Sequence, residues 1–322
     1  MADSRSGSTA GGSAAQNWTR AFRSVRGEEW GDLSGYLFIA PALLMFTVFG
    51  VWPTVRGFVM AFQDYRYLIP DHMPFVGFGN FVEMYHDKEF WAGLRRSIYF
   101  TLWYAPPNIV VPLILASMIA KVRHGKASAL YRIAAYLPVV LPTSVAVLLF
   151  AELFNFQFGY VNIFLTKILG LPWKPAWFGD PTYILPSMAI ASVWKHMGSN
   201  TLLFLVGLYN INSELYEAAS IDGANGLQQW RYVTLPMLKP ILTLVLVLSA
   251  EIVSATQEAL VLFNGGGPED AAMTLGIYAY MTAFRFGDLR WGYAAAMNLV
   301  LGLLAMFSAA TIFRLMRTER LQ

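Results

Sequence analysis

Ionisable and hydrogen-bonding side chains interrupt two otherwise apolar stretches of the sequence. Lys195 and His196 lie near the middle of residues 183–209, beside Ser199 and Asn200. In residues 241–263, polar residues spaced three and four apart share one helical face, with two more alongside: Glu251, Ser254, Glu258, Thr256 and Gln257. A charge at bilayer depth is costly unless it faces a bundle interior or a watery cavity. These residues therefore predict a polar pocket at mid-membrane depth.

Several kinds of chemistry fit this pattern. Lys195 could form a structural ion pair with Glu251 or Glu258, which would join two helices without any ligand. Alternatively, Lys195 and His196 could meet an anionic group on a ligand. The four ionisable residues could also relay protons or sodium ions in a secondary carrier. An acid and base pair of His196 and a carboxylate in a membrane enzyme is disfavoured, because catalytic residues cluster at neither membrane face.

A second polar stretch, residues 213–236, lies between two long apolar segments. Ser213 is predicted to cap a helix whose first turn holds glutamates, where negative charge meets the positive end of the helix dipole. Gly223 is expected to end this helix, and a second short helix is expected over residues 227–235. The nearly side-chain-free surface of residues 218–220 would let the backbone of another protein approach closely.

The sequence contains no recognisable nucleotide or metal site. Gly125-Lys126 is followed by alanine and lacks the first glycine of a Walker A motif, and residues 265–267 match a phosphate loop only weakly. There is no cysteine, and the four histidines form no pair on a common face. No cofactor is therefore expected in this chain, and ATP and Mg²⁺ would be bound by a partner.

The second polar stretch carries an E-A-A, a glycine and a Leu-Pro at fixed spacing, with Val233 where isoleucine is more usual. This pattern resembles the cytoplasmic EAA loop of permease subunits of binding-protein-dependent ABC importers. The resemblance implies that residues 210–240 couple the chain to two copies of a cytoplasmic ATP-binding subunit. The positions expected at that contact are Glu217, Ala218, Ala219, Asp222, Gly223, Leu235 and Pro236. A second, homologous permease subunit and a periplasmic or lipid-anchored solute-binding protein are further implied partners.

Motifs outside this loop, such as Pro175-Ala176-Trp177-Phe178 and Gly292-Tyr293, resemble the maltose permease and its carbohydrate-importing relatives over residues 35–314. By this resemblance the sugar-contacting positions are Thr143, Ser192, Lys195, His196, Ser199, Ser249, Val253 and Thr256, and we add Glu251, Gln257 and Glu258 from the polar face above. Three of these residue types differ from those of the maltose protein, so an oligosaccharide other than maltose, possibly an acidic one, is the expected substrate. The alternative is an ion-coupled secondary sugar transporter.

The composition requires a membrane protein. Of the 322 residues 56% are hydrophobic and 13% charged, and the net charge of +3 is too small to suggest binding to nucleic acid. Apolar segments long enough to span a bilayer cover residues 34–62, 94–120, 130–153, 183–209, 241–263 and 291–313. The predicted fold is an all-α membrane protein with six transmembrane helices, the type I ABC importer permease fold. Prolines within these spans require neighbouring helices that re-satisfy the freed backbone groups.

The distribution of Lys and Arg predicts the orientation in the membrane. The turn between the second and third spans is basic, whereas the predicted outer loops mix acids and bases. Both termini and the EAA loop are therefore expected in the cytoplasm of a bacterium, with the chain crossing the inner membrane. Residues 1–33 are predicted to be a disordered cytoplasmic tail, residues 34–316 the six-span permease domain in contact with membrane lipid, and residues 317–322 a cytoplasmic C-terminal tail.

Overall fold

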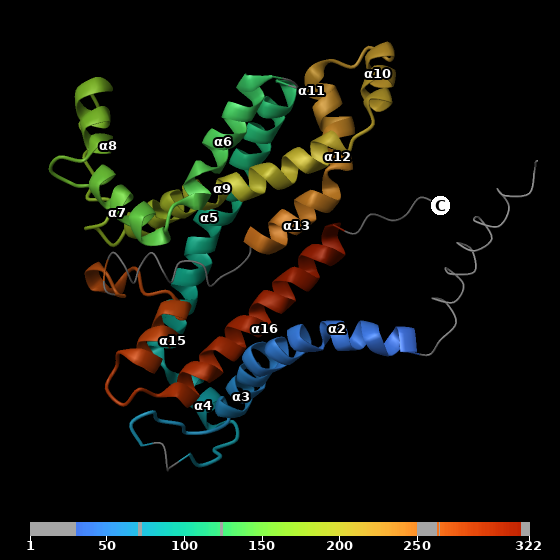
Figure 1. Ribbon diagram of the computed structural model, residues 1–322. Helices are drawn as coiled ribbons and strands as arrows, with labels where there is room; N and C mark the ends of the chain where they lie inside the picture. The colour runs from blue at the N-terminus through green and yellow to red at the C-terminus, as the bar shows by residue number, and fades with distance from the viewer. Residues whose placement is uncertain (1–29, 70–72, 123–124, 250–262, 264, 317–322) are drawn as a thin grey trace, which may run out of the picture. The chain divides into compact units, whose positions relative to one another are not determined.

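The computed structural model describes residues 30–69, 73–122, 125–249, 263 and 265–316 (Figure 1). The chain forms two compact units, residues 1–59 and residues 60–322. Regular structure in the described part is helical, with two isolated antiparallel bridges that pair Gln63 with Phe75 and Arg66 with Arg290. The all-α expectation is confirmed for these residues.

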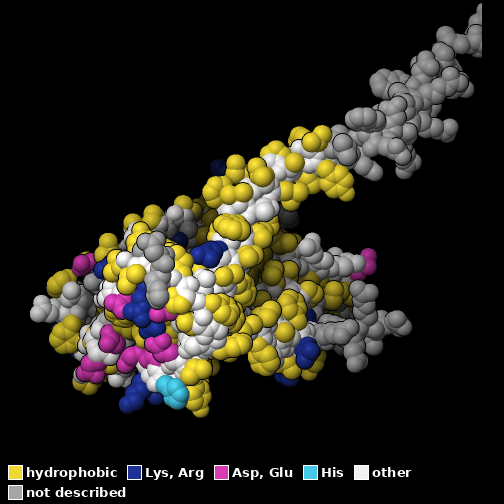
Figure 2. Space-filling view, turned by 90° about the horizontal axis from the view of Figure 1, so that it is seen from below, with side chains coloured by type: hydrophobic (Ala, Val, Ile, Leu, Met, Phe, Trp, Pro, Cys, Tyr) yellow, Lys and Arg dark blue, Asp and Glu magenta, His cyan; other side chains and the backbone are white. Residues whose placement is uncertain are grey.

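The described part of the first unit lies in one long apolar helical run. The run consists of α2 (Trp30–Phe46), the π-helical turn η1 (Thr47–Val51) and α3 (Trp52–Met60). Residues 35–60 are long and apolar enough to cross a membrane, and none of their most apolar window is buried. Hydrophobic side chains cover this run, with Phe38 89% and Phe49 74% exposed (Figure 2). Such a surface needs lipid or another protein around it.

The second unit contains the remaining helices. Its first part comprises α4 (Gly79–His86), α5 (Lys88–Lys121), α6 (Lys126–Val140), α7 (Thr143–Leu153), α8 (Tyr160–Ile163), η2 (Phe164–Ile168) and α9 (Ile184–Tyr209). Its second part comprises α10 (Ser213–Ile221), α11 (Gly226–Gln229), η3 (Trp230–Thr234), α12 (Leu235–Met237), α13 (Lys239–Ser249), η4 (Pro268–Asp270), α15 (Leu275–Phe284) and α16 (Trp291–Met316).

The described helices include between three and five candidate spans by length and composition. Residues 35–60, α5 and α16 qualify as single helices, in agreement with the first, second and sixth predicted spans. α9 matches the fourth in length with 26 residues but is not among the candidates, because its polar residues lower its hydropathy. The second half of the fifth predicted span, after Ser249, lies outside the described residues.

The third predicted span is wrong as a single helix. α6 and α7 are bent by 98° at a break between Val140 and Thr143, so they form a broken span or a re-entrant segment. The physical reason is Pro142, which has no N–H to donate to Pro138 and whose ring excludes a continuing helix. Leu141 consequently takes an extended conformation, with φ −66° and ψ 137°.

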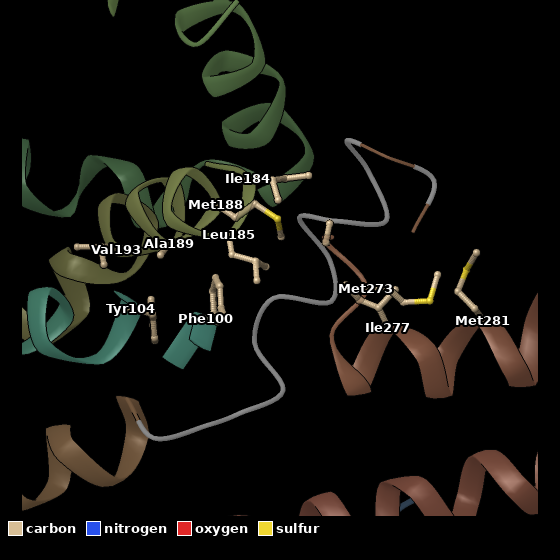
Figure 3. Close-up of a cluster of buried hydrophobic side chains, with 11 residues drawn as sticks. Phe100, Tyr104, Ile184, Leu185, Met188, Ala189, Val193, Met273, Ile277 and Met281 are labelled. Atoms are coloured by element: carbon tan, nitrogen blue, oxygen red, sulfur yellow. The ribbon is translucent and has the colours of Figure 1, made fainter. Parts of the chain in front are cut away.

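The helices pack through close contacts of small and apolar side chains. α5 lies along α9, and a cluster of buried side chains joins α5, α9 and the segment that leads into α15; it includes Phe100, Tyr104, Ile184, Met188 and Ile277 (Figure 3). Lipid is as apolar as these side chains, so van der Waals packing and interhelical hydrogen bonds must hold the bundle together. The apolar helix α15 was not predicted, since its 10 residues are too few for a span.

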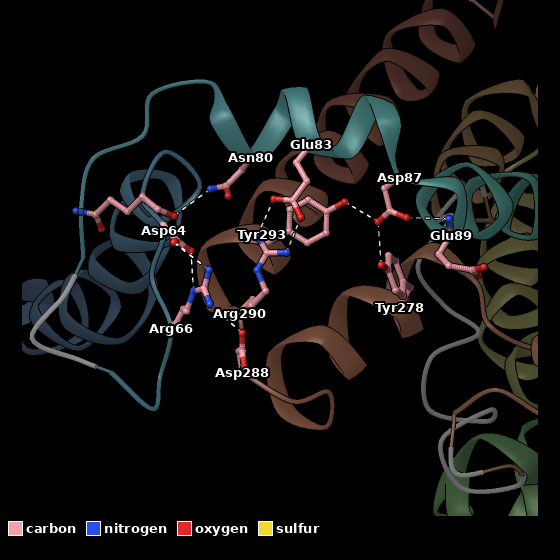
Figure 4. A network of polar contacts seen from close by, with 11 residues as sticks. Asp64, Arg66, Asn80, Glu83, Asp87, Glu89, Tyr278, Asp288, Arg290 and Tyr293 are labelled. Carbon is pink, nitrogen blue, oxygen red and sulfur yellow. Dashed lines mark hydrogen bonds and ion pairs between the residues drawn. The ribbon is translucent and has the colours of Figure 1, made fainter.

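A polar network fastens the ends of α5, α15 and α16 (Figure 4). One carboxylate oxygen of Asp87 accepts hydrogen bonds from Tyr278, at 2.8 Å, and Tyr293, at 2.6 Å. The other oxygen accepts the backbone N–H of Glu89 and so caps α5. Arg290 donates two bonds of 2.6 Å to Glu83 on α4. Burial and the bond to Asp87 raise the pKa of Tyr278, so its hydroxyl stays protonated and donates.

Candidate functional site: a helical elbow and a polar cluster within the bundle

The polar stretch after α9 folds as a helical elbow, α10 followed by the run from α11 to α12. Asn212 caps α10 by accepting the N–H of Glu214 at 3.1 Å, so the prediction of Ser213 as the cap is wrong by one residue. Asn212 has the same capping chemistry and comes first along the chain. The prediction that Gly223 ends the helix is confirmed, since its φ of +79° lies in the left-handed region that favours glycine.

The second arm of the elbow runs through residues 226–237. Asn225 opens it with a capping box, in which the Gln228 side-chain oxygen accepts the backbone N–H of Asn225. The helix predicted over residues 227–235 is confirmed, with a π-helical turn at η3. A 70° bend then leads into α13.

The two arms are tied together and anchored in the membrane bundle. Tyr216 and Thr234 share a hydroxyl–hydroxyl bond of 2.9 Å, and Gln229 donates to Ser220 at 2.9 Å. Trp230 and three other elbow side chains, Tyr216, Val233 and Leu235, pack against a buried cluster of the bundle. The cluster includes Leu113 and Ala116 of α5, Phe204 of α9, Val245 of α13, and Ile211 and Leu238 at the two ends of the elbow. A force on the elbow would therefore reach three helices at once.

The outward side of the elbow carries two large apolar side chains in open solvent. Ile221 is 87% exposed at the end of α10, and Leu227 is 75% exposed in α11. Glu217, Ala218 and Asp222 are also exposed, whereas Ala219 is half-buried. The sequence analysis missed both apolar residues, although an isoleucine and a leucine within a polar loop were a readable signal. Both side chains are therefore free of packing within the described chain and available for contact with another protein.

Within the bundle, α9 donates hydrogen bonds to backbone carbonyls of two proline-containing segments, one in α5 and one at the end of α6. Pro112 lacks the N–H that would bond Asn108 O, and Asn200 supplies a donor to that oxygen at 3.1 Å. Asn108 in turn donates to the buried Ser249 at 2.9 Å. These bonds join α5, α9 and α13, as expected for proline-containing helices in a bundle.

Lys195 on α9 makes the same kind of contact with α6. Its ammonium donates to the carbonyl oxygens of Leu141 at 2.6 Å, Val139 at 2.9 Å and Pro138 at 3.3 Å. His196 places Nδ1 2.8 Å from Ser192 O and its ring edge-on to Tyr104. Lys195 and His196 thus have partners within this chain.

The remaining predicted pocket residues differ in burial, and some of them lie outside the described part of the chain. Thr143 is the first residue of α7 and is half-buried, Ser192 is fully buried, and Ser199 is exposed. Thr143 lies two residues after Leu141, whose carbonyl accepts a hydrogen bond from Lys195. Five predicted positions lie outside the described residues: Glu251, Val253, Thr256, Gln257 and Glu258. Within the described part, three or more His, Asp or Glu side chains do not gather at any place that could hold a metal ion.

Comparison with known proteins places this architecture in a family. Residues 96–318 match the model of the "Binding-protein-dependent transport system inner membrane component". The chain is 33% identical to the lactose transport system permease protein LacF of Rhizobium radiobacter, with 85% of this chain and 90% of that protein covered. It is 30% identical to the sulfoquinovosyl glycerol transport system permease protein SmoG of Agrobacterium fabrum, with 92% and 95% covered.

The fold is that of a solved importer. A bacterial ABC transporter involved in the import of the acidic polysaccharide alginate superposes with a TM-score of 0.75 at 21% identity, with 92% of this chain and 98% of that chain covered. The same transporter has been solved in complex with a periplasmic protein bound to an alginate pentasaccharide. The sequence match and the shared helical fold agree: this chain belongs to the family of binding-protein-dependent transport system inner membrane components, as a multi-pass membrane permease subunit of an ABC importer.

Proposed function

We propose that the chain is one transmembrane subunit of an ATP-driven importer of oligosaccharides in the bacterial cytoplasmic membrane. Similarity to permeases named for lactose and for arabinooligosaccharides supports the substrate class. A second, homologous permease supplies the other half of the pathway. Two cytoplasmic ATPase subunits bind ATP and Mg²⁺ and drive the cycle, and a solute-binding protein delivers the sugar from outside. This chain contributes the pathway and the coupling contact.

The observation that carries the proposal is the anchored elbow. Ile221 and Leu227 project into solvent, while Tyr216 and Trp230 hold the other side of the elbow in the bundle. A short helix with exposed apolar side chains suits insertion into a groove of another protein. The small face of Ala218 and Ala219 permits close approach there, and Glu217, Asp222, Gly223 and Pro236 complete the contact. Leu235 packs toward the bundle and supports the elbow from behind. ATP-driven movement of the partner would then be passed directly to α5, α9 and α13.

The pocket for sugar is proposed from residues of α7, α9 and the segment after α13. Thr143, Ser192, His196 and Ser199 offer hydrogen-bonding groups, and Lys195 is a cationic side chain whose ammonium donates to backbone carbonyls of this chain. Thr256, Gln257, Glu251 and Glu258 are the proposed contributors from the fifth predicted span. The positive charge of Lys195 would favour an acidic sugar through long-range electrostatic attraction rather than through a direct hydrogen bond. Comparing uptake of uronate-containing and neutral oligosaccharides of equal length tests this preference.

The coupling proposal is tested by charging the apolar tip of the elbow. Ile221→Asp and Leu227→Asp should each reduce co-purification of the ATPase and ATP-driven sugar uptake by at least tenfold, because a buried unpaired carboxylate opposes the contact. Ile221→Leu, which stays apolar, is the matched control and should retain both. Uptake in wild-type cells should stop with vanadate and survive an ionophore. ATPase retention by both Asp variants, or uptake that an ionophore stops and vanadate does not, would refute the proposal and favour a secondary carrier.

A further inference from the structure

The break between α6 and α7 exposes backbone acceptors that the helix itself does not satisfy. In an unbroken helix the carbonyl of Pro138 would accept from residue 142 and that of Val139 from residue 143. Residue 142 is proline, and the extended Leu141 turns the chain away before Thr143 begins α7. In a membrane protein such a break is tolerated only where the freed carbonyls are paired within the protein or reach a water-filled cavity. The carbonyls at this break therefore need donors from outside α6.

Lys195 supplies these donors from α9. Its ammonium has three protons, and three carbonyls at the end of α6 lie within bonding distance, those of Leu141, Val139 and Pro138. The positive charge also matches the negative end of the α6 dipole. Close packing of the two helices makes the reach possible: a Cβ on Gly198 would lie 2.5 Å from Ala135 O and 2.9 Å from the Cα of Tyr136.

We propose that Lys195 is a positioning residue that fixes the angle between α6 and α7 and so determines where the Thr143 hydroxyl meets the sugar. Leu141, the acceptor of the shortest bond, is two residues before Thr143. Holding the Leu141 carbonyl therefore holds the start of α7. The first part of this inference, the fixed angle, stands on the structure alone. The second part, the consequence for sugar binding, rests on the proposed function.

A lysine suits this task better than other polar side chains. Its ammonium is a compact charge with three rotatable donors, whereas the planar fork of arginine directs its donors into one plane. The three acceptor carbonyls, of residues 138, 139 and 141, come from a helix end and the extended residue after it, so a single plane of donors does not suit them. Lys195→Arg should therefore keep the charge but hold the angle only in part, and Lys195→Met should lose both.

The angle can be measured without any assumption about function. Because the sequence has no cysteine, Ile133→Cys on α6 and Leu148→Cys on α7 provide the two spin-label sites, and both positions are well exposed. A continuous helix would separate their Cα atoms by about 22 Å, and the bend brings them closer. In the full chain in lipid nanodiscs, pulsed EPR should give a narrow distance distribution. Lys195→Met should broaden it and shift it to longer distances, with Lys195→Arg intermediate. Lys126→Met, the same change at an exposed lysine of α6, should leave it unchanged.

A wild-type distribution in Lys195→Met would overturn the proposal. If that variant does not assemble, Lys195→Gln replaces it, and a wild-type distribution there overturns the proposal equally. The second readout is sugar-stimulated ATPase activity of the complete transporter. Lys195→Met and Thr143→Val should each raise the half-saturating concentration about fivefold, and the double variant should raise it no further, because both act on one contact. Additive effects would refute the link to Thr143. Absence of sugar stimulation in the wild type would refute the proposed function and leave the distance result valid.

Discussion

Asp87 shows how a single residue can join three helices. It caps α5 with one oxygen and receives the hydroxyls of Tyr278 on α15 and Tyr293 on α16 with the other. Each hydroxyl bond to a carboxylate contributes about 2 kcal/mol when it is removed from full solvent. The pKa of Tyr278 is raised from its ordinary value of 10.0, first by burial and then by Asp87. The hydroxyl is therefore protonated and its hydrogen bond is present at neutral pH. The stabilisation from this bond is lost only when the pH rises above 10.0, the pKa of an ordinary tyrosine.

Removing one of these bonds should destabilise the protein measurably. Tyr293→Phe deletes the 2.6 Å bond and keeps the ring, so we expect a loss of about 2 kcal/mol in the free energy of unfolding. The midpoint of thermal unfolding in detergent, followed by tryptophan fluorescence, is the measurement. Tyr280→Phe is the matched control on α15, since that side chain is exposed. Equal shifts for the two variants would contradict the assignment.

For single residues, the sequence shows which positions are polar, but it does not show which groups they bind. The polar character of Lys195 and His196 within an apolar stretch is visible in the sequence. The partners of Lys195 are backbone carbonyls of another helix, 54 to 57 positions away. Their need for a donor arises only when the chain breaks at Pro142, so no pairing of side-chain types could have revealed it. Caps depend on neighbours in sequence, and there the error was one residue.

Elements of this protein are held at distances that only glycine allows. Gly198 on α9 faces the backbone of α6, and Gly93 on α5 faces the backbone of Leu275 on α15. Close approach of backbones strengthens van der Waals packing between membrane helices. It also brings Lys195 within reach of the α6 carbonyls, so helix spacing and hydrogen bonding depend on each other.

Adding one methyl group at the α6–α9 contact should therefore be costly. Gly198→Ala places a Cβ 2.5 Å from Ala135 O, and a rigid backbone cannot yield without moving the helix, at a cost of about 1–3 kcal/mol. The thermal midpoint should fall accordingly. Gly302→Ala in α16 meets nothing within 4 Å and should leave the midpoint unchanged or slightly raised. A loss of stability that is as large for Gly302→Ala would indicate a general intolerance of alanine rather than a specific contact.

Helices were predictable from the sequence where hydropathy alone determines them. α5 and α16 are long apolar runs, and the structure contains both. Proline positions were visible too, but the sequence does not say which proline breaks a helix: α5 continues through Pro106, Pro107 and Pro112, whereas the chain turns at Pro142. Whether a proline breaks its helix depends on hydrogen-bond donors from α9 and on packing between helices, and both belong to the tertiary structure. α15 escaped prediction because its 10 residues are shorter than a span.

On the scale of the whole molecule, the described helices expose far more apolar surface than a protein alone in water would. Large hydrophobic side chains of α2, α6, α7 and α16 are exposed, among them Phe38, Ile133, Leu148 and Phe307. Part of this surface faces lipid by necessity. The rest should be covered by the second permease subunit, if this chain supplies half of a pathway. The two kinds of surface can be distinguished by experiment.

The first helical run offers the clearest case, because none of its most apolar window is buried within the chain. Because the sequence has no cysteine, one cysteine introduced at an exposed position is the only thiol available for labelling. Suitable positions are Tyr36, Phe38, Leu43, Phe46 and Phe49. Spin labels there report access of dissolved oxygen, which is high in lipid and low within a protein contact. In the chain reconstituted alone, all positions should be accessible.

In the assembled transporter, positions on one helical stripe, repeating at three to four residues, should lose most of their oxygen access while the others keep it. That difference would identify the face on which the partner permease packs. Packing between membrane helices depends on steric fit rather than on water exclusion, so replacing a protected residue with a bulkier one should also weaken co-purification of the partner. Equal access at every position in both preparations would mean that lipid surrounds this helix completely, and that the partner contacts the chain elsewhere.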